Sequence, residues 1–255
     1  MCIRDSNKTA LITGGNGGIG LGIAEGYLQF GASVIIVGRN KKKNQDSKEY
    51  LTKKFPQSKV STYICDVTHK ESVDKLFDEI YKDYKSIDIL VNNAGINIRS
   101  AEPQELSYED WSLVISTNLS SMHIMSSKVI EGMKKNDSGK IINIGSMLST
   151  FGSSYGSAYA ASKGGVVQYT KSCADAWSKD NIQVNAILPG WIVTEMTEKF
   201  RTTYPERHSL IAPRTPAGRW GKPNDLSGTA IFLASEASQF VSGVSIPVDG
   251  GYSVR

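Results

Sequence analysis

Seven short apolar runs recur along the chain, and stretches with helical spacing of apolar residues separate them. The runs lie near 8–13, 33–37, 60–65, 87–91, 139–145, 182–188 and 244–248. Strands that alternate with helical segments are typical of a parallel sheet with helices on both faces and right-handed crossovers. The pattern therefore predicts an α/β fold with a doubly wound sheet of about seven parallel strands.

The organisation of the chain favours a single domain across 1–255, because no linker or internal repeat divides it. The least regular stretch is 189–216, which follows a predicted strand end where ligands of α/β proteins bind. We expect this stretch to form a mobile substrate lid. Residues 1–6 do not fit the approach to a first strand and take no part in the fold prediction.

A glycine-rich turn follows the first predicted strand and precedes a helical pattern that begins near Leu21. The turn reads Thr13-Gly14-Gly15-Asn16-Gly17-Gly18-Ile19-Gly20 and fits both G-x-G-x-x-G and T-G-x-x-x-G-x-G. Glycines allow a pyrophosphate to approach the backbone, and the helix N-terminus supplies free N–H groups and partial positive charge. The turn predicts a Rossmann-like dinucleotide site, with a merely flexible glycine turn as the alternative.

Tyr159 and Lys163 stand four residues apart in a predicted helix, so their side chains share one face. A free tyrosine has a pKa of about 10, and a nearby cation lowers it by favouring the phenolate. Ser146 follows a strand-like run, where its hydroxyl can bind a substrate oxygen. The three residues predict a proton-transfer site, although Tyr-x-x-x-Lys alone also fits ordinary surface residues. Tyr155 has no cation four residues on, so we expect it to pack or to shape the substrate pocket.

The glycine turn, Ser146 and Tyr159-x-x-x-Lys163 occur in the order found in the short-chain dehydrogenase/reductase family, which the chain resembles from about Lys8 to Ser253. Further matching motifs are Asp66-Val67, Asn92-Asn93-Ala94-Gly95, Asn118 within Ser116-Thr117-Asn118-Leu119, and Pro189-Gly190 with Thr194. Within the family, the chain is similar to dehydrogenases of gluconate and 2-deoxygluconate, especially over 214–223, and to 3-oxoacyl carrier-protein reductases.

The resemblance implies a role for each matching residue. Tyr159 would be the general acid/base, Lys163 would lower its pKa and hold the nicotinamide ribose, Ser146 would bind the reacting oxygen, and Asn118 would anchor a water in a proton relay. Contacts to the cofactor would come from Gly14, Asn16, Gly18, Ile19, Gly20, Arg39, Asp66, Val67, Asn92, Ala94, Gly95, Tyr159, Lys163, Pro189, Gly190, Ile192 and Thr194. Asp66 and the asparagines also fit turn-stabilising roles.

The implied activity is that of a nicotinamide-dependent oxidoreductase that interconverts a secondary alcohol and a ketone. A sugar acid or polyol is the expected substrate, and a 3-oxoacyl thioester is the alternative. A non-catalytic Rossmann-type nucleotide-binding protein would not need an intact set of Asn118, Ser146, Tyr159 and Lys163, and neither would a methyltransferase.

The substrate pocket would draw on residues near the reacting oxygen: Ile96, Asn97, Met147, Leu148, Tyr155, Trp191 and Met196. Arg99, Arg201 and Arg214 each offer a planar fork of donors that can meet a carboxylate. Each of these arginines also fits a surface or structural ion pair.

The expected cofactor is NADP(H), with NAD(H) as the alternative. NAD-selective sites usually place an acid on the ribose 2′-hydroxyl after the second strand, and here the chain has Gly38-Arg39-Asn40. Arg39 can bind a 2′-phosphate through a bidentate, charge-assisted contact, and the lysines at 41–43 add positive potential. Against this reading, the glycine turn lacks the basic residue that many NADP enzymes of the family carry between its first glycines.

The amino-acid composition indicates which kinds of partner the protein is expected to bind. The net charge of +4 is mild, and the lysines near 41–54 fit a solvated helix face, so no nucleic-acid partner is expected. No apolar run approaches the about 18 residues of a membrane span. The cysteines and histidines show no metal-ligand spacing, and three cysteines suit a reducing cytoplasm.

The helix after Tyr159 carries apolar residues on several faces: Val166, Val167, Tyr169, Cys173 and Trp177. A helix that is apolar on several faces is usually buried on more than one side. The pattern favours a homo-oligomer, and the family resemblance implies a tetramer.

Overall fold

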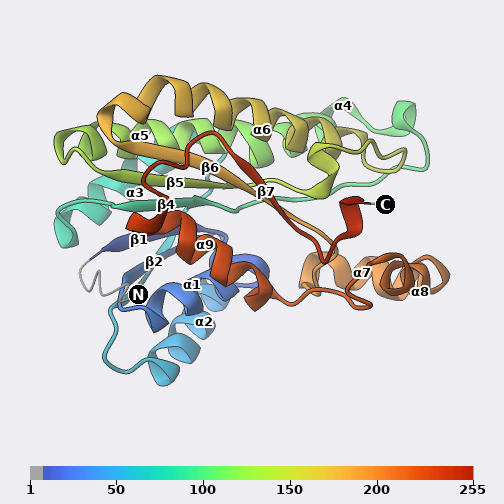
Figure 1. Cartoon of the computed structure of the whole chain (residues 1–255), viewed down its shortest axis with the longest axis horizontal. Helices are drawn as coiled ribbons and strands as arrows, with labels where there is room; N and C mark the ends of the chain where they lie inside the picture. Colours follow the sequence, from blue (N-terminus) through green and yellow to red (C-terminus); the bar gives the residue numbers. More distant parts are fainter. Residues whose placement is uncertain (1–7, 255) are drawn as a thin grey trace.

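The computed structural model describes residues 8–254, and the expectation for residues 1–6 lies outside this range. One sheet of seven parallel strands runs through the molecule in the order β3-β2-β1-β4-β5-β6-β7 (Figure 1). Its strands are β1 (Thr9–Thr13), β2 (Ser33–Gly38), β3 (Val60–Ile64), β4 (Ile89–Asn92), β5 (Gly139–Ile144), β6 (Ile182–Pro189) and β7 (Ser245–Val248). The predicted sheet is therefore confirmed, because each apolar run became a strand close to its expected bounds.

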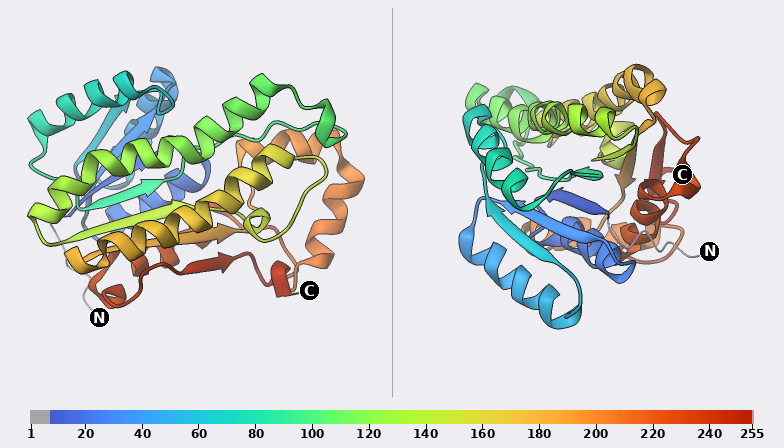
Figure 2. Two further views of the ribbon diagram at one scale, coloured as in Figure 1. Left: turned by 90° about the horizontal axis from the view of Figure 1, so that it is seen from above. Right: turned by 90° about the vertical axis from the view of Figure 1, so that its left-hand side faces the viewer.

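Helices cover both faces of the sheet (Figures 1 and 2). One face carries α3 (Lys70–Asp83), α5 (Ser121–Lys135) and α6 (Ser157–Trp177), and the other carries α1 (Gly18–Gln29), α2 (Lys41–Lys54) and α9 (Ser227–Ala234). Successive strand residues point to opposite faces, so Leu11 joins the first core while Ala10 and Ile12 join the second. Burial on both sides explains why the strands read as continuous apolar runs.

The sheet changes direction of winding between β1 and β4, which are neighbours in space although β2 and β3 lie between them in sequence. Thr13 joins the two strands: its Oγ1 accepts hydrogen bonds from the backbone N–H groups of Asn93 at 2.9 Å and Ala94 at 3.0 Å. A crevice opens at the carboxyl ends of the strands where such a sheet reverses its order, and ligands bind there.

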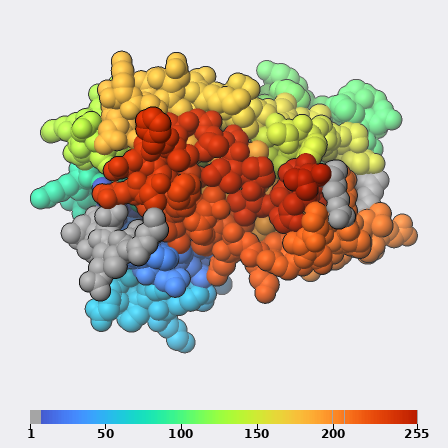
Figure 3. All heavy atoms as spheres, in the orientation of Figure 1, coloured from blue at the N-terminus to red at the C-terminus, as the bar shows by residue number. Residues whose placement is uncertain are grey.

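The segment 189–216 is mostly helical, which corrects the expectation of an irregular stretch. It contains α7 (Glu195–Thr203) and α8 (Pro205–Arg214), which lie together at one end of the molecule (orange in Figures 1 and 3). Thr194 caps α7 by accepting a hydrogen bond from the Thr197 N–H, and Pro205 begins α8 at a position that needs no N–H donor. Both helices are short, so their apolar spacing is hard to read from sequence.

Candidate active site

A cleft of about 670 Å³ follows the carboxyl ends of the strands. It contains most of the residues expected to contact a cofactor or substrate oxygen, although they come from distant parts of the chain: Gly14, Asn16, Gly18, Ile19, Arg39, Asp66, Val67, Ala94, Gly95, Ser146, Tyr159, Lys163, Pro189, Gly190, Ile192 and Thr194. Three expected residues do not line the cleft. Gly20 packs against the glycine turn, Asn92 contacts Asn143, and Asn118 contacts the backbone of Ile96.

The glycine turn is shaped by close backbone contacts. Gly14 has φ 64° and Gly18 has φ 51°, a region that favours glycine, and the Gly14 N–H donates to the Val37 carbonyl at 2.7 Å. A Cβ at Gly20 would lie 2.5 Å from the Gly14 carbonyl oxygen. Gly20 therefore lets α1 pack against the turn rather than touching the cleft.

The side chain of Asn92 turns away from the cleft, and its expected contact with a cofactor stays a prediction. Its side chain is buried, and its Nδ2 donates to Asn143 Oδ1 at 2.9 Å and to Ser126 Oγ at 3.2 Å. Asn143 in turn donates to Thr170 Oγ1 at 3.0 Å. Asn92 therefore joins β4, β5 and the helices that cover them.

Arg39 and Asp66 meet at the end of the cleft formed by β2 and β3. Arg39 Nη1 lies 3.6 Å from Asp66 Oδ2, and Asp66 Oδ1 accepts from the Thr68 N–H at 3.0 Å and the Thr68 hydroxyl at 2.7 Å. Partial burial acts to raise the pKa of Asp66, but the hydrogen bonds from Thr68 and the charge of Arg39 outweigh it and leave that pKa lowered. Asp66 is therefore an ionised acceptor beside an exposed guanidinium.

Tyr159 and Lys163 lie on the face of α6 that meets the end of β5. Lys163 Nζ lies 5.6 Å from the centre of the Tyr159 ring and donates to the Ile144 carbonyl oxygen at 2.7 Å. Ser146 comes two residues after Ile144 and hydrogen-bonds with Tyr159. Its Oγ also accepts from the Leu148 N–H at 3.1 Å, which fixes the turn after the strand. The structure thus brings together the three residues expected to transfer the proton.

Burial controls the protonation of this group. It raises the pKa of Tyr159, and the hydrogen bond with Ser146 and the positive charge of Arg99 oppose this rise without cancelling it. Burial also lowers the pKa of Lys163 to about 8. Ser146 and Arg99 are thus two groups that oppose the rise of the Tyr159 pKa in this fold. The effect of the Arg99 charge on the Tyr159 pKa could not be predicted from the sequence, because it depends on how the fold brings the two residues together.

Asn118 lies in a π-helical turn, Ser116–Ser120, between α4 (Tyr108–Ile115) and α5. The residue is fully buried: its Oδ1 accepts from the Ile96 N–H at 2.8 Å, and its Nδ2 donates to the Ile96 carbonyl at 2.9 Å and to Ser162 Oγ at 3.1 Å. A Cβ on Gly95 would lie 3.3 Å from Asn118 Oδ1 and 3.7 Å from Lys163 Nζ. Asn118 thus holds the loop that borders the cleft beside Lys163.

The expected substrate residues divide into two groups. Ile96, Asn97 and Met196 line the cleft with Tyr159. Met147, Leu148, Tyr155 and Trp191 lie outside this lining, and Trp191 stacks on Phe200 of α7 with 5.1 Å between ring centres. That stacking anchors the helical segment 195–214 to the end of β6.

The three candidate arginines differ in their surroundings. Arg99 lies over the Phe200 ring at 4.6 Å, and its charge acts on Tyr159. Arg201 pairs with Glu198 at 2.9 Å, and Arg214 lies over the Tyr252 ring at 4.4 Å. Arg99 is therefore the arginine of the three whose charge acts on Tyr159, although its side chain is not part of the cleft lining.

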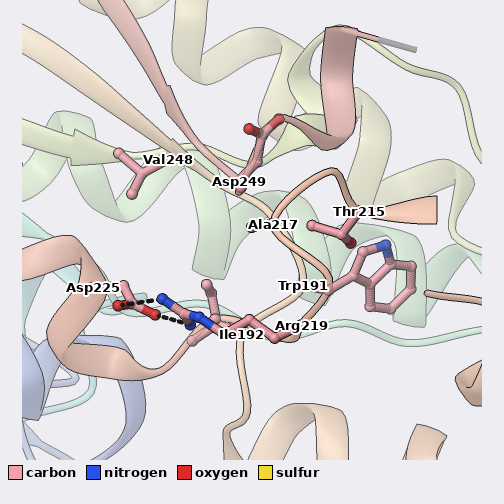
Figure 4. Close-up of a pocket in the computed structure, with 10 residues that line it drawn as sticks. Trp191, Ile192, Thr215, Ala217, Arg219, Asp225, Val248 and Asp249 are labelled. Atoms are coloured by element: carbon pink, nitrogen blue, oxygen red, sulfur yellow. Dashed lines mark hydrogen bonds and ion pairs between the residues drawn. The ribbon is translucent and has the colours of Figure 1, made fainter. Parts of the chain in front are cut away.

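A second pocket of about 210 Å³ lies beneath the segment that follows β6 (Figure 4). Arg219 enters it from one side and is held by Asp225, with contacts of 2.7 and 3.1 Å. Thr215 and Asp249 line it further along. The catalytic candidates are absent from this lining among the residues that the structure covers, so we assign the chemistry to the larger cleft.

Two further residues of the larger cleft were not expected from the sequence. Lys43, in the first turn of α2, forms an ion pair with Glu195, the first residue of α7. The pair crosses the cleft between two segments far apart in sequence. The lysines at 41–43 predict positive potential near the cofactor site, but no sequence pattern indicates which of the three lysines faces the cleft.

A glycine turn at the switch point of a parallel sheet, with Ser146, Tyr159 and Lys163 in the same cleft, defines an oxidoreductase that uses a nicotinamide dinucleotide. Residues 14–253 match the family model described as enoyl-(acyl carrier protein) reductase. The chain belongs to the short-chain dehydrogenase/reductase family.

Relatives with named activities cover almost the whole chain. A gluconate 5-dehydrogenase from Gluconobacter oxydans is 39% identical over 98% of this chain and 96% of its own length. A 2-dehydro-3-deoxy-D-gluconate 5-dehydrogenase from Escherichia coli is 40% identical over 97% of this chain and 96% of its own. A 3-oxoacyl acyl-carrier-protein reductase from Chlamydia trachomatis is 38% identical over 96% of this chain and 97% of its own.

A solved structure agrees with the fold in detail. The gluconate 5-dehydrogenase from Burkholderia cenocepacia, in complex with NADP and tartrate, has a TM-score of 0.92 and 35% identity, covering 100% of this chain and 98% of that one. Within residues 8–254, no helix has the length and apolar character to cross a membrane, and no three metal-type side chains cluster.

Proposed function

We propose that the protein interconverts a secondary alcohol and a ketone on a sugar acid, with NADP(H) as the cofactor. The observation that carries this proposal is that Ser146, Tyr159 and Lys163 line the same cleft as the glycine turn. Ser146 and Tyr159 offer hydroxyls to a reacting oxygen, and Arg99 offers a charge to a carboxylate on the same molecule. The relatives named as gluconate and deoxygluconate dehydrogenases support this substrate class.

The residues of the cleft fit a nicotinamide dinucleotide. Gly18 of the turn lies close to the start of α7, because a Cβ on Gly18 would lie 3.3 Å from Thr194 Cγ2. The N-terminus of α1 begins at Gly18 without a side-chain cap from Gly17, and Gly18 and Ile19 line the cleft, so this helix end suits a pyrophosphate. The dinucleotide would lie between the glycine turn, Asp66 and Thr194, and its nicotinamide supplies or accepts the hydride.

The protein's own part in the reaction is to hold the oxygen and to move one proton. In the reductive direction, Tyr159 donates its phenolic proton to the carbonyl oxygen while Ser146 donates a hydrogen bond to the same oxygen. Burial favours the protonated phenol needed for this step. Lys163, next to Asn118 beneath Gly95, would return a proton to Tyr159 from solvent. In the oxidative direction, Tyr159 takes the hydroxyl proton.

NADP(H) is favoured over NAD(H) because Arg39 stands at the end of β2, where an acid would repel a 2′-phosphate. Arg39 is more than half exposed and directed along the cleft beside Asp66. The gluconate 5-dehydrogenase solved with NADP supports the same choice.

The proposed substrate class is tested by turnover of the purified protein. Gluconate and deoxygluconate with NADP⁺, and their keto forms with NADPH, are compared with acetoacetyl thioesters, which a 3-oxoacyl reductase would use. Measurable kcat/KM on the sugar acids and little on the thioesters is the expected result. The reverse preference would favour the alternative that the Chlamydia relative represents.

The segment 189–216 is proposed to act as the lid of the same single catalytic domain. Its helix α7 borders the cleft through Met196 and packs on Trp191 through Phe200. Hydrogen exchange of α7 amides with and without NADPH tests this role. Slower exchange with the cofactor is expected.

A homotetramer in the cytoplasm is the proposed state of the protein. Phe240, between α9 and β7, is fully exposed, and Trp111 and Leu113 on α4 are more than a third exposed. Large exposed apolar side chains are typical of interfaces. Sedimentation at micromolar concentration should show a species well above the 27.7 kDa of one chain, and a monomer would contradict the proposal.

A further inference from the structure

The side chain of Lys43 fills the space beside Gly17 in the glycine turn. A Cβ on Gly17 would lie 2.9 Å from Lys43 Cε and 3.1 Å from Lys43 Nζ. Gly17 has φ 175°, which is extended backbone open to any residue. The backbone therefore does not require glycine at position 17, and the ammonium of Lys43 occupies the place that a side chain there would take.

We propose that Lys43 is the second cation, beside Arg39, that binds the 2′-phosphate of NADP(H). This inference rests on the proposed function, because it assumes that NADP(H) is the cofactor. Lys43 supplies from α2 the basic group that the glycine turn itself lacks. The two cations then stand on either side of Asn40, and both line the cleft.

The position of Lys43 is fixed by its neighbours in the first turn of α2. Asn40 caps the helix, and its Oδ1 accepts from the Lys43 N–H at 2.9 Å. The next residue, Asn44, is buried: it accepts from Asn16 Nδ2 at 2.6 Å and donates to the Gly38 carbonyl at 3.0 Å. The glycine turn, the end of β2 and the start of α2 therefore form one connected unit.

Both cations have a carboxylate partner that a phosphate can replace. Arg39 lies 3.6 Å from Asp66, and Lys43 pairs with Glu195, which is 80% exposed. The hydrogen bond from Lys43 lowers the pKa of Glu195, so this carboxylate is ionised at neutral pH. Exposed ion pairs contribute little free energy, and a phosphate dianion is a stronger partner for an ammonium. Lys43 can thus exchange Glu195 for the phosphate.

The pyrophosphate of the cofactor is the rival partner for Lys43, because the glycine turn also binds that group. Lys43 belongs to the segment that follows β2, where the adenosine ribose is read. Arg39 belongs to the same segment, and both side chains line the cleft. We therefore assign Lys43 to the 2′-phosphate, which NADPH carries and NADH lacks.

The test compares Kd for NADPH and NADH, measured by nicotinamide fluorescence without any substrate. Lys43→Met should weaken NADPH binding about tenfold or more, since a charge-assisted hydrogen bond is lost, and should leave NADH within about twofold. Lys42→Met is the matched control, because Lys42 is 86% exposed and pairs with Asp46 outside the cleft. It should change neither Kd.

A relocated charge gives a second measurement. In the Lys43→Met background, Gly17→Lys returns an ammonium to this part of the cleft from the glycine turn itself, and the extended backbone accepts the new side chain. Most of the lost NADPH affinity should return. A folded double variant that binds NADPH no better than Lys43→Met alone would contradict the spatial assignment.

The outcomes separate this inference from the proposed function. Equal weakening of NADPH and NADH by Lys43→Met would place Lys43 on the pyrophosphate and overturn the inference, with the proposed activity intact. Unchanged NADPH binding, or an equal effect of Lys42→Met, would also overturn it. A wild type that binds NADH more tightly would remove the cofactor assignment itself, and sugar-acid turnover with NAD⁺ would show whether the activity survives.

Discussion

The hydrogen bond from Lys163 Nζ to the Ile144 carbonyl, at 2.7 Å, joins α6 to the last residue of β5. The chain leaves β5 through Ser146 and returns as the helix that carries Tyr159. One buried contact therefore fixes the relative position of the hydroxyl, the phenol and the ammonium. A strand end is rigid because both its neighbours in the sheet hold it, and this gives the proposed proton-transfer group its geometry.

Tyr159→Phe should leave the fold and cofactor binding intact and reduce kcat by about 10²–10⁴-fold, the usual contribution of a general acid or base. The ring keeps its packing, and only the proton donor is lost. Steady-state turnover and NADPH titration of the same preparation measure both effects. Near-native turnover would refute the assigned role.

Lys163→Met should reduce both turnover and affinity for the cofactor, because Lys163 lines the cleft and its ammonium lies 5.6 Å from the centre of the Tyr159 ring. Lys171→Met is the matched control, since Lys171 is an exposed lysine two turns further along α6. That control should keep both properties. Loss of neither property in Lys163→Met would make its pairing with Tyr159 incidental.

Stability should also depend on pH through Lys163. Its pKa is about 8 in the folded protein against an ordinary value of 10.5. Between these values the unfolded chain binds the proton and the native protein does not, so stability rises with pH across this window. The free energy of unfolding of wild type minus Lys163→Met should rise by up to about 3 kcal/mol from pH 8 to 10.5. Urea unfolding at several pH values measures it, and a flat difference would contradict the burial argument.

Arg39→Ala should lower kcat/KM with NADPH by about tenfold to a hundredfold and change the value with NADH little, because only NADPH carries the 2′-phosphate. Asp66 would then face the phosphate without its cation partner. Lys41→Ala serves as the control, since Lys41 is exposed and outside the cleft lining. A cofactor preference unchanged by Arg39→Ala would show that Arg39 does not read the phosphate.

Arg99→Met should raise KM for a sugar acid about tenfold or more, since the carboxylate loses a charged partner while the methionine still packs on Phe200. The charge of Arg99 lowers the pKa of Tyr159, so its removal should also move the pH profile of alcohol oxidation to higher pH. Arg214→Met, whose guanidinium lies over Tyr252, is the control. Equal kinetics of both variants would refute the role of Arg99.

Gly20→Ala should destabilise the protein by about 1–3 kcal/mol and weaken cofactor binding, because its Cβ would lie 2.5 Å from the Gly14 carbonyl oxygen. Gly132→Ala, in α5, meets nothing within 4 Å and should stabilise by about 0.5–1 kcal/mol. Thermal unfolding of the two variants tests the contrast. A tolerated alanine at position 20 would mean that the turn can move away from α1.

The sheet was predictable because both its faces are buried, and such strands leave uninterrupted apolar runs. The placements of Ser146, Tyr159 and Lys163 were predictable because short motifs fix their local geometry. For Asn92, the motif gives its place at the end of β4 but not the direction of its side chain, which turns toward Asn143.

The remaining site features depend on contacts between distant segments. Lys43 and Gly17 meet only because α2 returns beside the glycine turn. The charge of Arg99 acts on Tyr159 only in the folded protein, and no spacing of residues in the sequence indicates that the two are close. The helices α7 and α8 were missed because each is short and its caps, Thr194 and Pro205, look like loop residues in sequence.

The bonds from Thr13 to Asn93 and Ala94 have a consequence for how the molecule matures. A nascent chain that has emerged only as far as α3 already carries the glycine turn, but the strand that completes the crevice has not yet been made. Pro189 and Gly190, which line the crevice, are made later still. The Gly190 N–H donates to the Val248 carbonyl at 3.1 Å, and this bond can form only after β7 has been made. Affinity for the dinucleotide should therefore appear late in synthesis, so that cofactor capture reports on a chain that has folded throughout.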